Sequence, residues 1–221
     1  MLIGHYAASL VLKGVDKRTS LGMLFLAVQF VDILFLPLVL TGVEHFNIVE
    51  NFTESTHFDL YFMPYTHGLL ASFFWAGAVY IAFRFLSLTK AVNKNRAAIV
   101  MGLAVLSHWF LDLIVHTPDL PLWSDSSTKV GFGLWNNAIA TYLLEAILLL
   151  VGLGIYLKST KGSTFAGRYG MIILVVLMLI INVNNIFGPP MADDKVTMSV
   201  AGLLMYFIFT GVAFWLDGKR S

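Results

Sequence analysis

Residues 97–116, AAIVMGLAVLSHWFLDLIVH, decide the fold, because this 20-residue stretch is apolar except for a few groups near its end. A helix rises about 1.5 Å per residue, so about 20 apolar residues cross the hydrocarbon core of a bilayer. Several other stretches meet the same requirement. The pattern predicts six membrane spans, at about 20–43, 62–88, 97–116, 137–157, 168–187 and 197–216.

The composition agrees with a membrane protein. Of 221 residues, 58% are hydrophobic and only 12% are charged, whereas a soluble domain carries about 25% charged residues. We therefore expect an all-α polytopic membrane protein in which residues 1–221 form a single transmembrane domain. The net charge of +1 gives no indication of a nucleic-acid partner. Because the chain has no cysteine, disulfides and thiolate metal ligands are excluded.

The loops between the predicted spans differ in charge. Basic residues precede the first span and occupy every second loop and the C-terminus, at Lys13, Lys17, Arg18, Lys90, Lys94, Arg96, Lys158, Lys161, Arg168, Lys219 and Arg220. The first loop of the other set, 44–60, holds four acidic residues and no Lys or Arg. Basic loops remain in the cytoplasm. The pattern predicts six spans with both ends of the chain cytoplasmic.

Residues 1–13 are too short to span a membrane. Two placements agree with their sequence. The segment could lie flat on the cytoplasmic surface, or residues 2–13 could enter the bundle as a half-helix with Met1 deepest and Lys13 at the headgroups. Every charged side chain of the first 18 residues lies at or after Lys13, which favours the inserted half-helix.

Several ionisable residues fall at a common depth in the predicted spans. Counted at 1.5 Å per residue from the cytoplasmic edge, Asp32 lies at ~18 Å, His108 at ~17 Å and Asp112 at ~22 Å. His67 and Glu145, counted from the other edge, lie at ~18–22 Å. Ionisable groups at membrane depth are costly and mostly functional. Their common level predicts one polar site shared by different helices.

The sharpest motif is the ladder His108, Asp112 and His116, spaced four residues apart. Residues at this spacing share one helix face. Imidazole nitrogen and carboxylate oxygen suit zinc, and also manganese or iron(II). His108 and Asp112 can bind one ion. His116 lies ~12 Å from His108 on a straight helix, so it could serve a second ion, support a ligand or bind substrate.

An ordinary structural role is the alternative for each of these groups. A single membrane histidine can be a hydrogen-bond partner between helices, and Asp32 could pair with Arg84, the one basic side chain within the spans. We expect Arg84 instead to reach the cytoplasmic interface. The carboxylates of Asp32, Asp112 and Glu145 then lack basic partners other than histidine, so a divalent cation or bound protons must neutralise them.

Six short motifs resemble those of the YdjM-like membrane-bound metal-dependent hydrolases, which are bacterial inner-membrane proteins. They are Ile3-Gly4-His5, Gln29-Phe30-Val31-Asp32, Pro64-Tyr65-Thr66-His67, Ser107-His108 with Asp112 and His116, Thr117-Pro118-Asp119-Leu120-Pro121 and Gly133-Leu134-Trp135-Asn136. They cover roughly the first two thirds of the chain; the remainder is similar in hydropathy and in its Asn-x-Phe-Gly-Pro-Pro ending. The resemblance implies a metal bound by His5, Asp32, His67, His108 and Asp112, with His116 as a further candidate. It also implies that His5 lies inside the bundle.

These observations predict a metal-dependent hydrolase with an intramembrane site open to the outer leaflet. Zinc is the expected metal, with manganese or iron as alternatives, and membrane lipids surround a lipid-like or amphiphilic substrate. Glu145 is a candidate general base, while His116 and Asp119 could move protons or hold a headgroup. Two other functions agree with the same residues: a proton- or metal-coupled transporter, and a structural membrane subunit stabilised by a metal.

Overall fold

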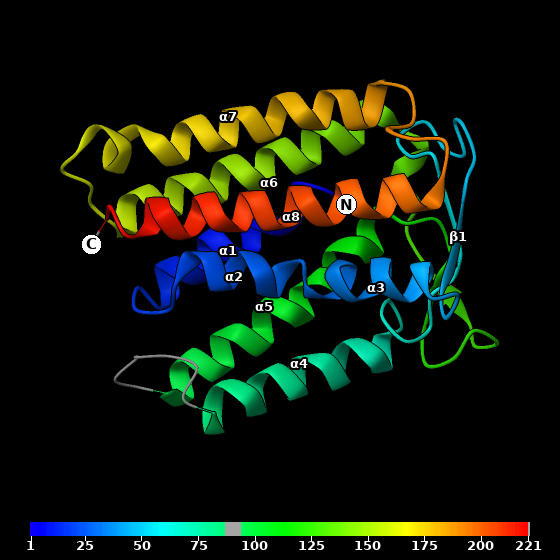
Figure 1. Cartoon of the computed structure of the whole chain (residues 1–221), viewed down its shortest axis with the longest axis horizontal. Coiled ribbons are helices and arrows are strands. Elements are labelled where there is room, and N and C mark those ends of the chain that lie inside the picture. Colours follow the sequence, from blue (N-terminus) through cyan, green and yellow to red (C-terminus); the bar gives the residue numbers. More distant parts are fainter. Residues whose placement is uncertain (87–93, 221) are drawn as a thin grey trace.

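The computed structural model describes residues 1–86 and 94–220 and is a helical bundle (Figure 1). Its α-helices are α1 (Gly4–Val15), α2 (Leu21–Val28), α3 (Phe30–Leu40), α4 (Leu69–Phe85), α5 (Lys94–Val115), α6 (Ala138–Ser159), α7 (Phe165–Phe187) and α8 (Lys195–Asp217). Its short elements are β1 (His45–Ile48), β2 (Phe58–Phe62), β3 (Leu120–Pro121), β4 (Lys129–Val130) and the 3-10 helix η1 (Leu134–Asn136). Lys90 and the last residues of the predicted second span, 87–88, lie outside the described residues.

The helices agree with a membrane protein but supply four or five clear spans rather than six. Among the described residues, α5, α6, α7 and α8 are long and apolar enough to cross a bilayer. The pair α2 and α3 passes the same criterion only as one span bent by 50°. Helix α4 is apolar but has only 17 residues. Six spans are therefore not confirmed.

The second predicted span begins later than expected. Residue 62 ends strand β2, and α4 begins at Leu69 after a turn. Pro64 lacks a backbone N–H and restricts the residue before it, which favours a turn over a helix at this point. His67 consequently lies in the turn that precedes α4 and not within a span.

The first predicted span bends at Gln29 and not at its proline. Pro37 lies within α3, which continues to Leu40. The break lies at Gln29, where φ of −102° and ψ of 7° depart from helical values and end α2. The predicted end of α7 is confirmed, since Gly188 follows its last residue, Phe187.

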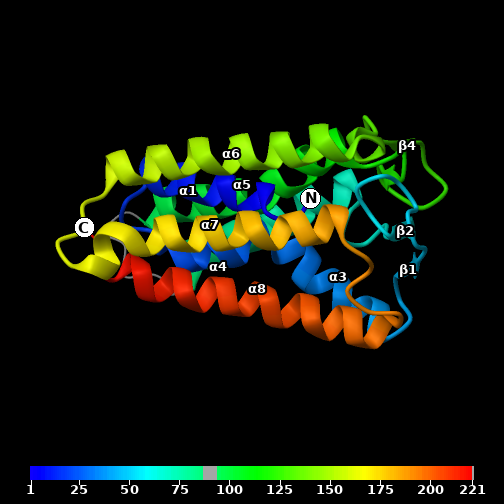
Figure 2. The ribbon, with the colours of Figure 1, turned by 90° about the horizontal axis from the view of Figure 1, so that it is seen from above.

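Helix α1 is enclosed by the bundle, as the inserted placement predicts (Figures 1 and 2). The side chains of Ile3, Tyr6 and Leu10 are fully buried, and α1 packs against α6, α2 and α5. Gly152 of α6 allows this approach, because a Cβ at that position would lie 2.9 Å from the Ala7 carbonyl oxygen. The surface placement of residues 1–13 is therefore excluded.

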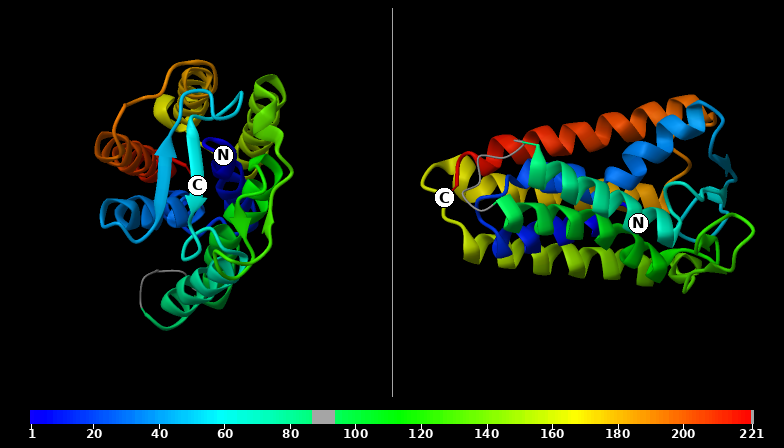
Figure 3. Two further views of the ribbon diagram at one scale, coloured as in Figure 1. Left: turned by 90° about the vertical axis from the view of Figure 1, so that its right-hand side faces the viewer. Right: turned by 90° about the horizontal axis from the view of Figure 1, so that it is seen from below.

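The two ends of the bundle are closed in different ways. Strands β1 and β2 pair antiparallel and lie with β3, β4 and η1 at one end (Figure 3). At the other end, Lys13 Nζ lies 2.9 Å from Asp217 Oδ2 and ties α1 to α8. There too, Arg220 donates a 2.8 Å hydrogen bond from Nε to Thr160 Oγ1, joining the segment after α8 to the loop between α6 and α7.

Candidate metal centre

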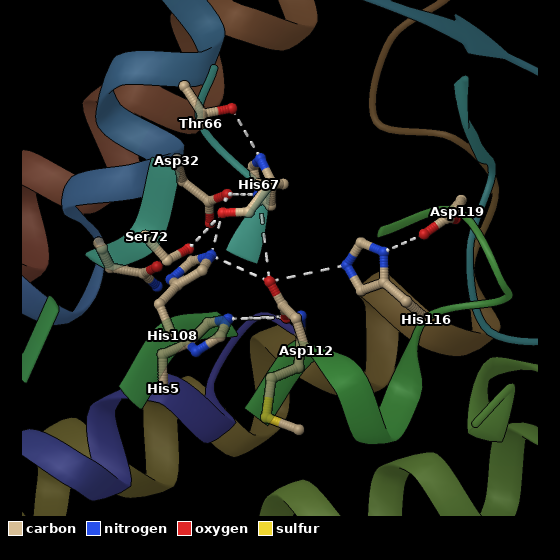
Figure 4. A network of polar contacts seen from close by, with 12 residues as sticks. His5, Asp32, Thr66, His67, Ser72, His108, Asp112, His116 and Asp119 are labelled. Atoms are coloured by element: carbon tan, nitrogen blue, oxygen red, sulfur yellow. Dashed lines mark hydrogen bonds and ion pairs between the residues drawn. The ribbon is translucent and has the colours of Figure 1, made fainter. Parts of the chain in front are cut away.

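The five predicted metal ligands meet in one buried group (Figure 4). We call His5, Asp32, His67, His108 and Asp112 the His/Asp cluster. His108 Nε2 lies 3.0 Å from Asp112 Oδ2, His5 Nε2 lies 3.1 Å from Asp112 Oδ1, and His67 Nε2 lies 3.2 Å from Asp32 Oδ1. Ligand atoms of His5, Asp32 and His108 all fall within 4.8 Å of one another, as do those of His67, His108 and Asp112. These five residues, which come from separate parts of the sequence, are therefore close enough to form one site.

The bend at Gln29 fixes the orientation of His108. A helix end leaves carbonyl groups without intrahelical partners, and the Val28 carbonyl oxygen lies 2.7 Å from His108 Nδ1. A carbonyl oxygen only accepts, so Nδ1 carries the hydrogen and the neutral ring has its lone pair on Nε2. His108 Nε2 is buried and makes no hydrogen bond to any described residue. It faces Asp112 Oδ2 at 3.0 Å and Asp32 Oδ1 at 3.6 Å.

His67 is oriented through Glu44, which the sequence placed only in an acidic loop. Thr66 Oγ1 donates to Glu44 Oε2 at 2.6 Å, so it accepts from His67 Nδ1 at 2.9 Å. Glu44 Oε1 also accepts from the backbone amides of Tyr65 and Thr66, at 2.8 and 3.0 Å. The fully buried Glu44 carboxylate thus holds the turn before α4 and directs His67 Nε2 toward Asp32.

His116 adjoins the cluster with a carboxylate partner of its own. Its Nδ1 lies 2.7 Å from Asp119 Oδ1, and Thr117 Oγ1 donates to Asp119 Oδ2 at 2.8 Å. The other nitrogen, Nε2, lies 3.6 Å from Asp112 Oδ2. The ring stacks against Trp135 with centroids 4.1 Å apart. Asp119 therefore stabilises the form of His116 whose Nε2 lone pair faces the cluster.

The donor set fits a divalent metal ion. Two histidines of the cluster, His67 and His108, have their Nδ1 hydrogens directed to oxygen acceptors, so their Nε2 lone pairs face the carboxylate oxygens of Asp32 and Asp112. A lone pair facing a carboxylate oxygen is repulsive unless a proton or a cation lies between them. Histidine held through its second nitrogen is the usual arrangement of a metal ligand. The cluster could therefore hold a divalent ion.

One expectation about charge is corrected by the structure. The cluster's carboxylates were expected to lack basic partners other than histidine, but the α-ammonium group of Met1 lies 2.6 Å from Asp112 Oδ1. It also lies 3.5 Å from His5 Nε2. The ammonium group contacts one oxygen of Asp112 and leaves Oδ2 facing His108. Asp32 pairs with His67 and not with Arg84, which is exposed and stacks on Phe85.

Glu145 contacts the start of α1. Its Oε2 accepts hydrogen bonds from the amides of Ile3 and Gly4, at 2.8 and 3.0 Å. These amides are among the donors that a helix N-terminus leaves without partners, and a carboxylate there is favoured by the helix dipole. Glu145 thus fixes α1, and through it His5. Its predicted role as general base stays a prediction.

A cavity of ≈ 270 Å³ reaches the cluster. Its lining includes Asp32, His67, Asp112, His116 and Glu145, together with residues of α3, α7, α8 and the β1–β2 segment. Tyr206 of α8 also lines it and donates its hydroxyl to Asp32 Oδ2 at 3.1 Å. Sequence reasoning missed Tyr206, because a single tyrosine in an apolar span is indistinguishable from a packing residue.

Comparison of the chain with protein-family models, with curated proteins and with solved structures gives no match. The resemblance to the YdjM-like proteins therefore remains a prediction from short motifs. The motifs themselves lie close together, since His5, Asp32, His67 and the His108–His116 ladder all contribute to one site. The function must accordingly be argued from that site.

Proposed function

We propose that the chain is a membrane-bound metal-dependent hydrolase whose ion is bound by the His/Asp cluster, as in the YdjM-like family. The observation that carries this proposal is the buried Nε2 of His108, which faces two carboxylate oxygens and makes no hydrogen bond within the described structure. Zinc suits this mixture of imidazole and carboxylate, and manganese and iron(II) are the alternatives. The cavity beside the cluster would admit both substrate and water.

The proposal includes six spans, with α4 and the bent α2–α3 pair among them, and both ends of the chain in the cytoplasm of a bacterium. Helix α4 is ~26 Å long at 1.5 Å per residue, which a bilayer accommodates by slight thinning. Apart from Lys129 and Lys195, the basic residues that the structure describes lie toward the end of the bundle that holds Lys13 and Arg220, and the acidic segment 44–60 lies at the other. This asymmetry supports a cytoplasmic basic end.

A divalent ion, when bound, would polarise the scissile group and make water nucleophilic near neutral pH. His116 is placed to handle the proton. Its Nε2 lone pair faces the cluster, and Asp119 stabilises the ring when it becomes charged. As water adds to the scissile carbonyl or phosphoryl group, His116 takes its proton. The same proton then passes to the leaving oxygen as its bond to that group breaks, which restores neutral His116.

The position of the cavity favours hydrolysis over transport. A carrier must open a path on each side of its site in turn, so the packing on the closed side has to separate. On the Lys13 side of the cluster, the side chains of Leu10, Leu24, Phe25 and Met101 pack in the core with at most 2% exposure. None of these four side chains lines the cavity. On the other side, 17% of the Asp32 side chain is exposed to the cavity, as a reactive site requires.

Elemental analysis of the purified protein tests the proposal. We expect a stoichiometric transition metal in the parent chain, and its loss in His108→Ala. Asp112→Asn should lose metal with little loss of fold, because the apolar packing around it remains. His45→Ala is the matched control, since His45 stacks on Tyr61 outside the cluster. A metal-free parent, or equal metal loss in the control, would refute the ligand assignment.

A hydrolysis assay across lipid classes then tests the reaction itself. A chelator should abolish cleavage, and zinc, manganese or iron(II) should restore it. His116→Ala should lower the rate by about 100-fold or more, the usual contribution of a general base, while metal content stays at the parent level. A metal-loaded protein that cleaves none of the lipid classes would leave the structural-subunit alternative as the better description.

A further inference from the structure

The cavity beside the His/Asp cluster has two walls that differ in their share of polar groups. The wall toward the β1–β2 segment and the end of α7 is mixed: its polar side chains are Ser55, Thr56, His57, Asn184 and Asn185, and apolar side chains such as Phe46, Phe58 and Ile186 lie among them. Apolar side chains lie between α3 and α8, at Phe35, Leu36, Met198 and Met205, with Gly202 among them. The cluster adjoins both walls.

We propose that the apolar wall between α3 and α8 binds the alkyl chain of an amphiphilic substrate, while the substrate's polar group lies at the cluster. This inference rests on the proposed hydrolase function, because it names the class of substrate for the same site. A molecule with one flexible chain and one polar, hydrolysable group matches the two walls. A fully polar substrate would leave the apolar wall in contact with water, which is unfavourable.

The size and the residue types of the cavity suit a flexible chain. Its volume of ≈ 270 Å³ is close to the lower end, about 300 Å³, of pockets that bind small ligands. Methionines Met1, Met191, Met198 and Met205 line it. Unbranched methionine adapts its shape to irregular apolar partners, and a chain with many rotamers is such a partner. Aromatic side chains at those positions would favour a rigid ring instead.

The membrane next to α7 and α8 could supply an amphiphilic substrate to this cavity. The outward faces of α7 and α8 carry large exposed apolar residues, among them Ile180, Val183, Leu204 and Phe207, as expected where helices face lipid. Both helices also line the cavity. A chain-bearing molecule in the bilayer therefore approaches the same two helices that enclose the site.

Gly202 controls the space available to the chain. A Cβ at this position would lie 3.1 Å from Leu36 Cδ1, so the glycine lets the Leu36 side chain of α3 pack directly on the backbone of α8. Gly202→Leu should fill the apolar part of the cavity. Gly211 offers a matched control in the same helix, because it is exposed and no described atom lies within 4 Å of a Cβ built there.

Photo-crosslinking in lipid nanodiscs tests the inference. The probe is dodecylphosphonate with a diazirine at the end of its chain, and the labelled residues are identified by mass spectrometry. We expect labels on Leu36, Met198 and Met205. Because the added side chain occupies the space of the chain, Gly202→Leu should reduce this labelling by about tenfold, which corresponds to about 1.4 kcal/mol of binding free energy. Gly211→Leu should leave it unchanged.

Metal content, measured on the same samples, separates this inference from the proposed function. Labels confined to outward residues such as Leu204 and Phe207, in a protein that retains its metal, would overturn the chain site alone. A metal-free protein would overturn the hydrolase proposal. In that case, labelling of Leu36 and Met205 would still show whether an alkyl chain binds between α3 and α8. If Gly202→Leu does not fold, Met198→Trp narrows the same wall from a position that already carries a side chain.

Discussion

At the scale of single residues, the partners behind the histidines matter as much as the histidines. The Val28 carbonyl, the Thr66 hydroxyl and the Asp119 carboxylate each contact an Nδ1 atom. Each therefore leaves an Nε2 lone pair directed at the cluster. Such outer partners set the orientation and basicity of a metal ligand. The Thr66 hydroxyl is oriented in turn by Glu44. The orientation of His67 therefore depends on two further residues, Thr66 and Glu44, that are not part of the cluster.

Glu44→Gln tests this dependence. The amide keeps the shape of the side chain but replaces one acceptor oxygen with a donor, which must then face the amide of Tyr65 or the amide or hydroxyl of Thr66. We expect metal affinity to fall by about 10- to 100-fold, as is usual when an outer partner is lost. A competition titration against a zinc chelator measures this affinity. Glu50→Gln, on an exposed residue of the same loop, should have no effect; equal affinities in the two variants would show that Glu44 does not support the site.

The sequence predicted the site residues that follow a local pattern and missed those that act through contacts between distant parts of the chain. His108, Asp112 and His116 follow from helical spacing and Asp32 from its depth along a helix, because both are properties of the linear sequence. The depth predicted for His67 assumed a helix from residue 62, where the structure has a turn before α4. Glu44 and Tyr206 act through contacts with residues 22 and 174 positions away. No local pattern encodes such contacts. The Val28 carbonyl was also unpredictable, since it becomes available only where α2 breaks.

At the scale of elements, the packing of α1 on α6 carries His5 into the site. Glu145 of α6 caps the first turn of α1, and Gly152, two turns further along α6, allows Ala7 to approach closely. The sequence favoured an inserted half-helix from its charge distribution alone. It could not identify the helix that receives α1, because both glycine and alanine are common in any membrane span.

Two glycines of α6 provide a matched test of this packing. Gly152→Ala places a Cβ 2.9 Å from the Ala7 carbonyl oxygen, a backbone atom that cannot move alone, and should lower the free energy of unfolding by about 1–3 kcal/mol. Gly154→Ala meets no described atom within 4 Å and should be neutral or slightly stabilising through helix propensity. Thermal unfolding in detergent compares them. Equal effects would argue that α1 does not dock on α6.

The bend within the first predicted span also belongs to this scale. Proline was the natural candidate, since it lacks a backbone donor, yet α3 continues through Pro37 and the chain breaks at Gln29. There the Gln29 side chain donates to the Leu2 carbonyl at 3.2 Å, and Val28 contacts His108. The break coincides with contacts to α1 and α5, which a sequence window over one span does not include.

At the scale of the whole molecule, charge and structure divide the bundle into two ends. The Lys13–Asp217 pair and Arg220 gather the helix ends on one side. The β1–β2 segment covers the other, and the cavity beside the His/Asp cluster opens toward that segment. The difference in charge between the two ends was predictable, because the Lys and Arg content of each loop can be read directly from its own sequence. The small β-strands were not, since the predicted second span included residues that form β2.

The proposed orientation can be tested with cysteines, because the chain has none of its own. Ser126 and Ser163 are both exposed and lie on either side of α6. An impermeant maleimide should label Ser126→Cys in intact bacterial cells, since its loop is expected outside. Ser163→Cys should react only after permeabilisation. The opposite pattern would reverse the orientation, and labelling of both positions in intact cells would mean that α6 does not cross the membrane.

The enclosure of α1 has a consequence for biogenesis. The amides of Ile3 and Gly4 bind a carboxylate that is 142 and 141 residues away in the chain. During translation, α1 leaves the ribosome well before α6 and therefore waits for its receptor until α6 has been made. The last steps of maturation should be the docking of this early segment and the acquisition of the ion, in a bundle that is already inserted.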